Sequence, residues 1–186
     1  MDFTYSEPQV RTDILSLDRE SIGNLPEGLD QSRFRWVDLD GDGLSGVLTD
    51  TDGSWYYKRN LTANNLVEQF DGSVATRTRF GPLEAVAALP SHSDLSRGQQ
   101  FLDLSVDGRL DLVAFADSDP GYFERAKDAS FEPFHRFASL PQLNCSDPNL
   151  KFIDLTDDGL ADILITEDGL FTFHPSLGEA GFDVAE

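Results

Sequence analysis

The sequence predicts an all-β fold built from β-propeller blades, with about three four-stranded antiparallel blades that form an incomplete or half ring. Three observations lead to this prediction. A strand, an Asp-rich loop and a second strand occur three times along the 186 residues. Each copy is followed by a turn, an aromatic strand and a last strand that begins with Phe. Four short strands per unit, at a period of roughly 50 to 65 residues, are typical of propeller blades.

The repeated unit is clearest in the string NLKFIDLTDDGLADILI at 149–165, and edited copies read FRWVDLDGDGLSGVL and QQFLDLSVDGRLDLV. The runs that leave the loops (GVL, DLVAF and DILI) are short, apolar and partly β-branched, which predicts buried strands and not helices. The interval from the last-strand Phe to the first Asp of the next loop is the same twice, from Phe80 to Asp103 and from Phe131 to Asp154. This constancy indicates a structural repeat.

The chain is expected to divide into four parts. Residues 1–32 form an N-terminal segment whose run VRTDILSL predicts one strand, interpreted as the outer strand of a preceding blade. Blade 1 covers 33–88 and carries a polar insertion at 61–79, which is expected to be an exposed excursion. Blade 2 covers 89–139, and blade 3 covers 140–186. Leu-Pro pairs mark the connections between these units.

The third strand of each blade is aromatic, with the strings WYYK, YFER and LFTFH. The fourth strand is expected to begin at Phe80, Phe131 and Phe182 in the three blades. Aromatic residues that alternate along an inner strand usually pack between neighbouring blades. The aromatic strands are therefore expected to supply the core.

The three Asp-rich loops predict calcium sites. Ca²⁺ prefers six to eight hard oxygens, and a short loop can bring alternate side chains to one point when a glycine takes the sharp bend. Gly43, Gly108 and Gly159 stand at that bend. We count Asp38, Asp103 and Asp154 as position 1 of their loops. The candidate ligands at positions 1, 3, 5, 7 and 9 are Asp103, Ser105, Asp107, Arg109 and Asp111; Asp154, Thr156, Asp158, Leu160 and Asp162; and, without position 9, Asp38, Asp40, Asp42 and Leu44.

Two other interpretations of these loops were weighed. An EF-hand also begins D-x-D-x-D-G, but it needs a glutamate at position 12, where this chain has Thr49, Ala114 and Ile165, and it needs a helix on each side. The second interpretation is that Asp-Gly loops are simple hairpin turns, which would need no metal. Oxygen-bearing side chains at matched spacing in two loops favour the calcium interpretation.

The first loop is expected to bind calcium least well. It has Gly46 at position 9, where the second and third loops have aspartates, so it lacks one side-chain oxygen. The sequence alone therefore predicts the lowest occupancy in this loop. It also predicts that Gly46→Asp would strengthen the site.

Composition limits the possible partners. The formal net charge of −20 argues against binding nucleic acid or an anionic membrane surface, since both need clusters of Lys and Arg. Cations are the expected partners. The single cysteine, Cys145, excludes an intramolecular disulfide, and neither a signal peptide nor a membrane-spanning run is visible.

The loops, with the trailing F-G/E-P, resemble FG-GAP (VCBS) repeats. The longer strings LPEGLDQSRFRWVDLDGDGLSGVLT, GQQFLDL, DPNLKFIDLTDDGLADILITEDG and PSLGEAGF resemble the middle or N-terminal region of the B component of bacterial insecticidal toxin complexes and SpvB-type relatives. The resemblance covers essentially residues 20–186. It implies a propeller segment that docks the toxin-encapsulating B–C shell onto the pore-forming A component and acts as a gate. It also implies a virulence protein that is secreted or lies at the surface of a bacterium.

Two further functions and one assembly were considered. A carbohydrate-binding or adhesion module would use the WYY run at Trp55 as a stacking platform. An enzyme is not expected, because His92, His135 and His174 lie in unrelated contexts without a catalytic motif. Three blades leave open edges, so two copies could form a homodimer of half-propellers, or a longer parent polypeptide could complete the ring.

Overall fold

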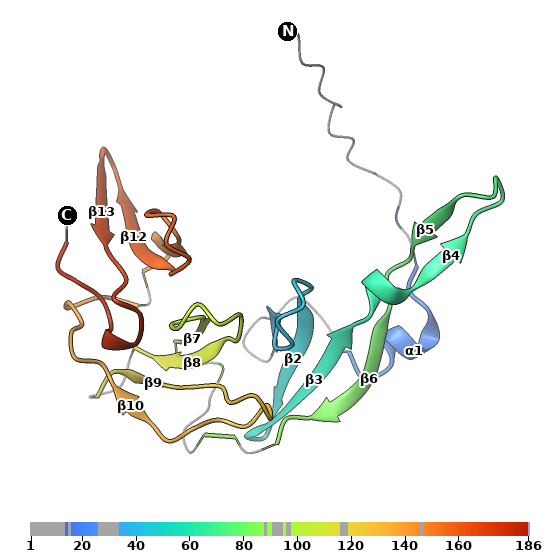
Figure 1. The fold of residues 1–186 in the computed structure, drawn as a ribbon, viewed down its shortest axis with the longest axis horizontal. Coiled ribbons are helices and arrows are strands. Elements are labelled where there is room, and N and C mark those ends of the chain that lie inside the picture. Colours follow the sequence, from blue (N-terminus) through green and yellow to red (C-terminus); the bar gives the residue numbers. More distant parts are fainter. Residues whose placement is uncertain are drawn as a thin grey trace, which may run out of the picture.

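The computed structural model describes residues 14, 16–25, 34–87, 89–90, 95, 98–115, 119–145 and 147–185. In these parts of the chain the regular structure is almost entirely β, with thirteen strands paired in antiparallel sheets. Three of the sheets follow one another along an open arc (Figure 1). The predicted all-β fold class is confirmed. No helix in the described ranges is long and apolar enough to cross a membrane.

Each of the three sheets begins with a strand, a loop and an antiparallel strand, as the repeat predicted. The first sheet has the order β1-β2-β3-β6, where the strands are β1 (Phe34–Val37), β2 (Gly46–Thr51), β3 (Ser54–Asn60) and β6 (Phe80–Ala85). The second has the order β10-β9-β8-β7, with β7 (Gln99–Leu102), β8 (Asp111–Ala114), β9 (Gly121–Phe123) and β10 (His135–Arg136). The third consists of β11 (Leu150–Ile153), β12 (Asp162–Glu167) and β13 (Leu170–His174).

The expected start of the fourth strand is correct at Phe80, whereas Phe131 and Phe182 do not begin a regular strand in the other two blades. Phe131 forms only an isolated bridge, and β10 begins four residues later. Blade 3 has three regular strands among the described residues, and Phe182 forms only an isolated antiparallel bridge with Ser176, just after the third strand. Phe182 also bonds to Ser139 of blade 2. Its N–H donates to the Ser139 carbonyl at 3.0 Å, and the Ser139 hydroxyl donates back to the Phe182 carbonyl at 2.9 Å. The segment at Phe182 therefore links blades 2 and 3, and its buried ring packs in the core between them.

The N-terminal segment contains a short helix that the sequence analysis did not predict. Helix α1 (Arg19–Ile22) begins at Asp18, whose carboxylate accepts the Ser21 N–H at 2.8 Å. Most of the predicted strand VRTDILSL lies outside the described residues. Leu17 and Leu25, on either side of α1, pack on the first face of blade 1. A second copy of the chain would have to displace this segment in order to pack there.

The insertion of blade 1 forms a projecting hairpin (Figure 1). A 3₁₀ turn, η1 (Thr62–Asn64), leads into β4 (Leu66–Glu68), which pairs with β5 (Val74–Thr76). Leu66, Phe70 and Val74 are exposed on it. The predicted exposed excursion is therefore present.

The core lies between neighbouring blades. Trp55 and Tyr57 of β3 are buried with residues of blade 2, and the Trp55 ring lies 5.8 Å from that of Phe101. Between blades 2 and 3, Phe115 stacks on Phe152 at 5.3 Å. The aromatic strand of blade 1 is thus core, as expected, and its indole is not free to stack on a ligand.

The far side of blade 3 is uncovered, and we call it the blade 3 open face (Ile153, Leu164, Phe171 and Phe173). Strand register makes these four residues the counterparts of Val37, Leu48, Trp55 and Tyr57, since Leu164 lies opposite Phe173 as Leu48 lies opposite Tyr57. In blade 1 this row is covered by the next blade, and Trp55 is 1% exposed. In blade 3, Ile153 is 46% and Phe171 is 70% exposed.

Candidate metal centre

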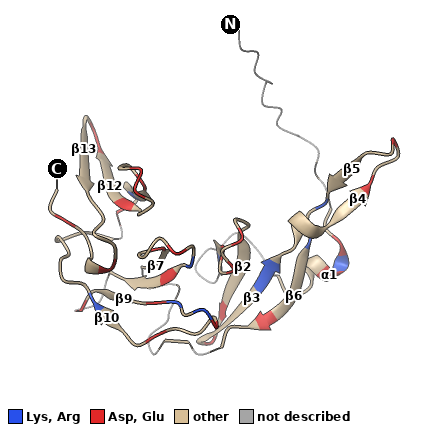
Figure 2. Cartoon of the chain, viewed as in Figure 1, with Lys and Arg blue, Asp and Glu red and all other residues tan. Residues whose placement is uncertain are grey.

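The three predicted calcium loops lie in a row on the concave side of the arc. They join the first and second strands of each sheet, and we call them loop 1 (38–45), loop 2 (103–110) and loop 3 (154–161). Acidic residues gather on them (Figure 2). A Cβ added to Gly41 of loop 1 would lie 2.5 Å from the Gly108 carbonyl oxygen of loop 2, so the tips of these loops touch.

The aspartate at position 1 organises each loop. In loop 3 the Asp154 carboxylate accepts main-chain N–H groups from Asp157 at 2.7 Å, Asp158 at 3.3 Å and Gly159 at 3.0 Å. Asp38 accepts all three corresponding bonds in loop 1, and Asp103 accepts those from Asp107 and Gly108 in loop 2. The position 1 carboxylate therefore holds the loop closed even without a metal.

Two positions in each loop have left-handed backbone. Position 6 is the predicted glycine bend, with φ of 82°, 82° and 86° in loops 1 to 3. Position 4 is also left-handed, and there loop 1 has Gly41, loop 2 has Val106 at φ 57° and loop 3 has Asp157 at φ 60°. A β-branched residue is strained in this region, whereas Asn and Asp tolerate it. Loop 2 therefore carries local strain at Val106.

Relief of this strain should stabilise the protein. We expect Val106→Asn to raise the free energy of unfolding by about 1 kcal/mol, because Asn adopts left-handed backbone more readily than Val. Urea denaturation measures the change. Asp157→Asn is the matched control in loop 3, and it should change the stability by less than about 0.5 kcal/mol. An equal or opposite effect of the two substitutions would contradict the prediction.

The aspartates at position 9 are buried parts of the framework. Asp162 is fully buried, and its carboxylate accepts N–H groups from Leu155 at 2.9 Å and Ser176 at 2.7 Å. Asp111 does the same in blade 2, with Leu104 and Arg125 as donors. Burial raises the pKa of Asp111 to about 6. The sequence identified both residues as ligand positions, but their burial and their main-chain bonds were not foreseen.

The donor chemistry of loop 3 fits calcium best. Asp154, Thr156 and Asp158 are exposed hard-oxygen donors, and no described residue forms an ion pair with the two carboxylates. An oxygen that accepts one N–H keeps a second lone pair for a cation. In the described ranges no three His, Cys, Asp or Glu side chains already converge on one point, so these carboxylates would have to turn toward the ion.

Loop 2 offers the same donor types with a competitor. The Asp107 carboxylate pairs with the guanidinium of Arg109, which also donates to the Arg125 carbonyl at 3.0 Å. The predicted position 7 residues Arg109, Leu160 and Leu44 have no acidic side chain and could offer only their main-chain carbonyls. A cation in loop 2 would therefore have to displace a guanidinium.

The structure contradicts the expected effect of Gly46→Asp in loop 1. A Cβ at Gly46 would lie 2.5 Å from the Lys58 carbonyl oxygen and 2.5 Å from the Tyr57 ring and hydroxyl. An aspartate has no room there, so the substitution would disrupt the loop and not strengthen it. The sequence could not show this, because the obstructing ring comes from a different strand.

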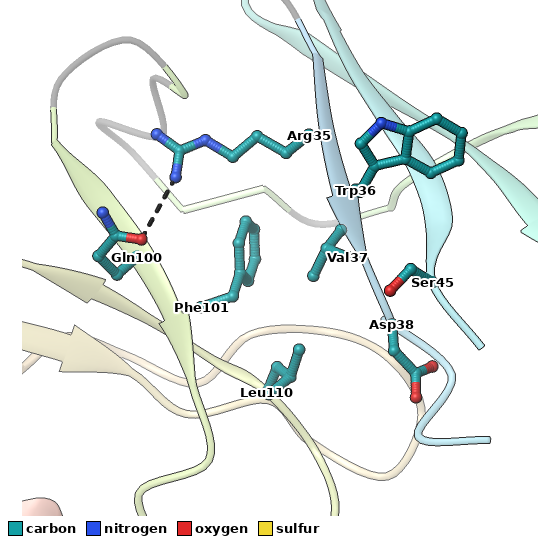
Figure 3. Close-up of a pocket in the computed structure, with 8 residues that line it drawn as sticks. All are labelled: Arg35, Trp36, Val37, Asp38, Ser45, Gln100, Phe101 and Leu110. Carbon is teal, nitrogen blue, oxygen red and sulfur yellow. Dashed lines mark hydrogen bonds between the residues drawn. The ribbon is translucent and has the colours of Figure 1, made fainter. Parts of the chain in front are cut away.

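A hollow lies between the first strands of blades 1 and 2 (Figure 3). Its volume is about 320 Å³, and Arg35, Asp38 and Gln100 are among its lining residues. The Arg35 guanidinium donates to the Leu95 carbonyl at 2.6 Å, and burial lowers its pKa. Trp36 and Phe101 also line the hollow, and the Trp36 ring lies 6.0 Å from that of Phe80.

Comparison with known proteins adds structural neighbours. No protein-family model matches this chain, and no curated protein matches it. A chain of the Tc holotoxin pore of Photorhabdus luminescens is similar to it, with a TM-score of 0.62, 23% identity and 83% of this chain covered. A lectin of Agrocybe aegerita that recognises non-reducing terminal N-acetylglucosamine is also similar, with a TM-score of 0.52, 17% identity and the same coverage.

Both likenesses concern the fold. Each identity is below one quarter, and the chain spans only 7% of the length of the toxin chain and 38% of the length of the lectin chain. Two proteins with different roles thus share these blades. Function has to be argued from the surfaces and loops of this chain.

Proposed function

We propose that this chain is a non-enzymatic, calcium-binding β-propeller segment of a toxin-complex B component, with FG-GAP-type repeats. Its role is protein–protein assembly and gating with the pore-forming A component, with the C component as a second partner. The fold likeness to a Tc holotoxin pore chain and the resemblance of the strings at 20–186 support this proposal. We also propose that the protein is secreted by a bacterium or lies on the bacterial surface.

The blade 3 open face supports the assembly role, because it has the composition of a contact that a further blade or a partner protein covers. Its apolar row repeats rows that are buried in blades 1 and 2, yet Phe171 is left exposed. Contiguous exposed apolar surface is typical of protein–protein contacts. The high negative charge argues against nucleic acid and against insertion into an anionic membrane.

Calcium is proposed for loops 2 and 3. Their carboxylates repel one another, and a dication would neutralise most of that repulsion. Asp154 and Asp158 with Thr156 would hold the ion in loop 3, and Asp103 and Asp107 with Ser105 would hold it in loop 2. The ion would brace the row of loops and supply no chemistry beyond charge neutralisation.

Sedimentation with purified toxin-complex A and C components tests the assembly role. We expect the chain to form a complex with at least one component, and Phe171→Asp on the open face to weaken it at least about tenfold, because a charge would enter an apolar contact. Phe70→Asp, on the exposed hairpin, is the control and should leave binding unchanged. The absence of a complex, or equal effects of both substitutions, would contradict the proposal.

A carbohydrate-binding module is the second candidate. The hollow between β1 and β7, with Arg35, Asp38 and Gln100 around it, and the likeness to a lectin favour this candidate. The burial of Trp55 removes the platform expected from the WYY run. Trp36 and Phe101 nevertheless line the hollow, and sugar sites usually need such an aromatic platform. Binding on a glycan array that is lost in Arg35→Ala would favour the lectin function.

A further inference from the structure

We infer that loop 1 holds no calcium ion, and that Tyr57 and Arg59 take the places of the position 9 carboxylate and of the cation. The inference rests on the proposed calcium function of loops 2 and 3. It assigns to blade 1 a loop that is complete without metal. Three observations carry it: the bonds of the Tyr57 hydroxyl, the space around Gly46, and the guanidinium groups near Asp40.

The Tyr57 hydroxyl accepts a hydrogen bond from the main-chain N–H at position 2 of loop 1, which a carboxylate accepts in loops 2 and 3. At position 2 of loops 2 and 3, the N–H groups of Leu104 and Leu155 donate to the position 9 aspartates. At the same position of loop 1, the Leu39 N–H donates to the Tyr57 hydroxyl at 3.3 Å. That hydroxyl in turn donates to the Val37 carbonyl at 3.2 Å. Tyr57 therefore closes loop 1 with a neutral group.

The Tyr57 ring also occupies the space of the missing side chain. Its Cζ and hydroxyl oxygen lie 2.5 Å from the point where a Cβ of Gly46 would stand. Gly46 and Tyr57 together thus replace the position 9 aspartate of the other two loops, since the glycine leaves the space that the tyrosine ring fills. Tyr122 holds the equivalent strand position in blade 2, opposite Val113, but its ring stacks on Phe137 at 5.6 Å and its hydroxyl has no hydrogen-bond partner among the described residues.

Positive charge is already present at loop 1. The Arg59 guanidinium lies 2.8 Å from the Asp40 carboxylate at position 3. Arg125 of blade 2 is 6% exposed, its Nη1 has no hydrogen-bond partner within the described ranges, and Asp40 and Tyr57 act on it electrostatically. Arg59 thus pairs with a carboxylate of loop 1, the buried Arg125 acts on the same carboxylate, and both guanidinium groups would repel Ca²⁺ there.

The Arg59 ion pair alone would be weak support, because half-exposed ion pairs contribute little to stability. Three features of loop 1 act together. Loop 1 has its position 9 acceptor replaced, the space for a ligand side chain filled, and a buried second guanidinium nearby. Loop 3 has none of these features among its described neighbours.

Calcium stoichiometry is the first test. Isothermal titration with CaCl₂ should give two ions per chain for the natural protein and none for Asp103→Asn combined with Asp154→Asn, where Asn keeps an acceptor for the loop N–H groups. One ion bound by the double variant would overturn the inference. No binding by the natural protein would overturn the proposed calcium function instead, and the inference for loop 1 would then be decided by the second test.

Substitution of Tyr57 is the second test. Tyr57→Phe keeps the ring but leaves the Leu39 N–H and the Val37 carbonyl without their partner, so we expect the melting temperature to fall by about 5 °C, equally in Ca²⁺ and in EGTA. Tyr122→Phe is the matched control and should change it by less than about 2 °C. Equal shifts for the two variants, or a Tyr57→Phe loss that Ca²⁺ abolishes, would overturn the inference.

Discussion

Asp162→Ala is expected to lower the free energy of unfolding by about 4 kcal/mol. The Asp162 carboxylate is fully buried and accepts two main-chain N–H groups, from Leu155 and Ser176. Hydrogen bonds to a charged group contribute roughly 1.5 to 3 kcal/mol each, and a buried N–H without a partner costs about as much. Because natural domains are stable by only about 5 to 15 kcal/mol, this substitution brings blade 3 close to unfolding.

Urea denaturation in EGTA isolates this structural effect from any bound ion. Asp158→Ala is the matched control, because Asp158 is exposed and its carboxylate accepts, among the described residues, only the Leu160 N–H of its own loop, at 2.9 Å. That substitution should cost less than about 1 kcal/mol. Similar losses for the two variants would show that Asp162 does not tie the blade together.

The repeat could be predicted from sequence because its signals are local. The strand before Asp154, the glycine at position 6 and the apolar strand after the loop are all set by spacing along the chain. The same spacing located the position 9 aspartates. It could not reveal that Asp162 is buried against Ser176, since that contact depends on where the third strand returns.

Features that depend on tertiary packing were missed or wrong. In loop 1 the Tyr57 ring from β3 fills the space where a side chain at position 46 would lie, and its hydroxyl binds the loop. No pattern in the neighbouring sequence indicates this contact. The short helix α1 depends on the Asp18 cap and on Lys58, whose buried ammonium donates to the carbonyls of Glu20 at 3.2 Å and Gly23 at 2.6 Å. The first feature and the Lys58 contacts of α1 depend on residues far apart in the chain, whereas the Asp18 cap is a local signal that the sequence analysis missed.

Millimolar Ca²⁺ is expected to raise the melting temperature by about 10 to 20 °C relative to EGTA. An ion that binds only the folded state at 100 times its Kd contributes about 2.7 kcal/mol per site, and loops 2 and 3 provide two sites. For a chain of this length, 1 kcal/mol corresponds to a shift of about 2 to 4 °C. Scanning calorimetry in the two buffers measures the shift.

The two loops should contribute unequally to that shift, which gives the prediction its internal control. Asp154→Asn should remove more of it than Asp103→Asn, because the Arg109 guanidinium already occupies Asp107 in loop 2 and has to be displaced by the ion. Arg109→Gln removes this competitor and should enlarge the calcium shift while leaving the melting temperature in EGTA nearly unchanged. A melting temperature that does not respond to calcium in the natural chain would refute the metal function of both loops, whereas a response unaffected by Asp154→Asn would place the ion elsewhere.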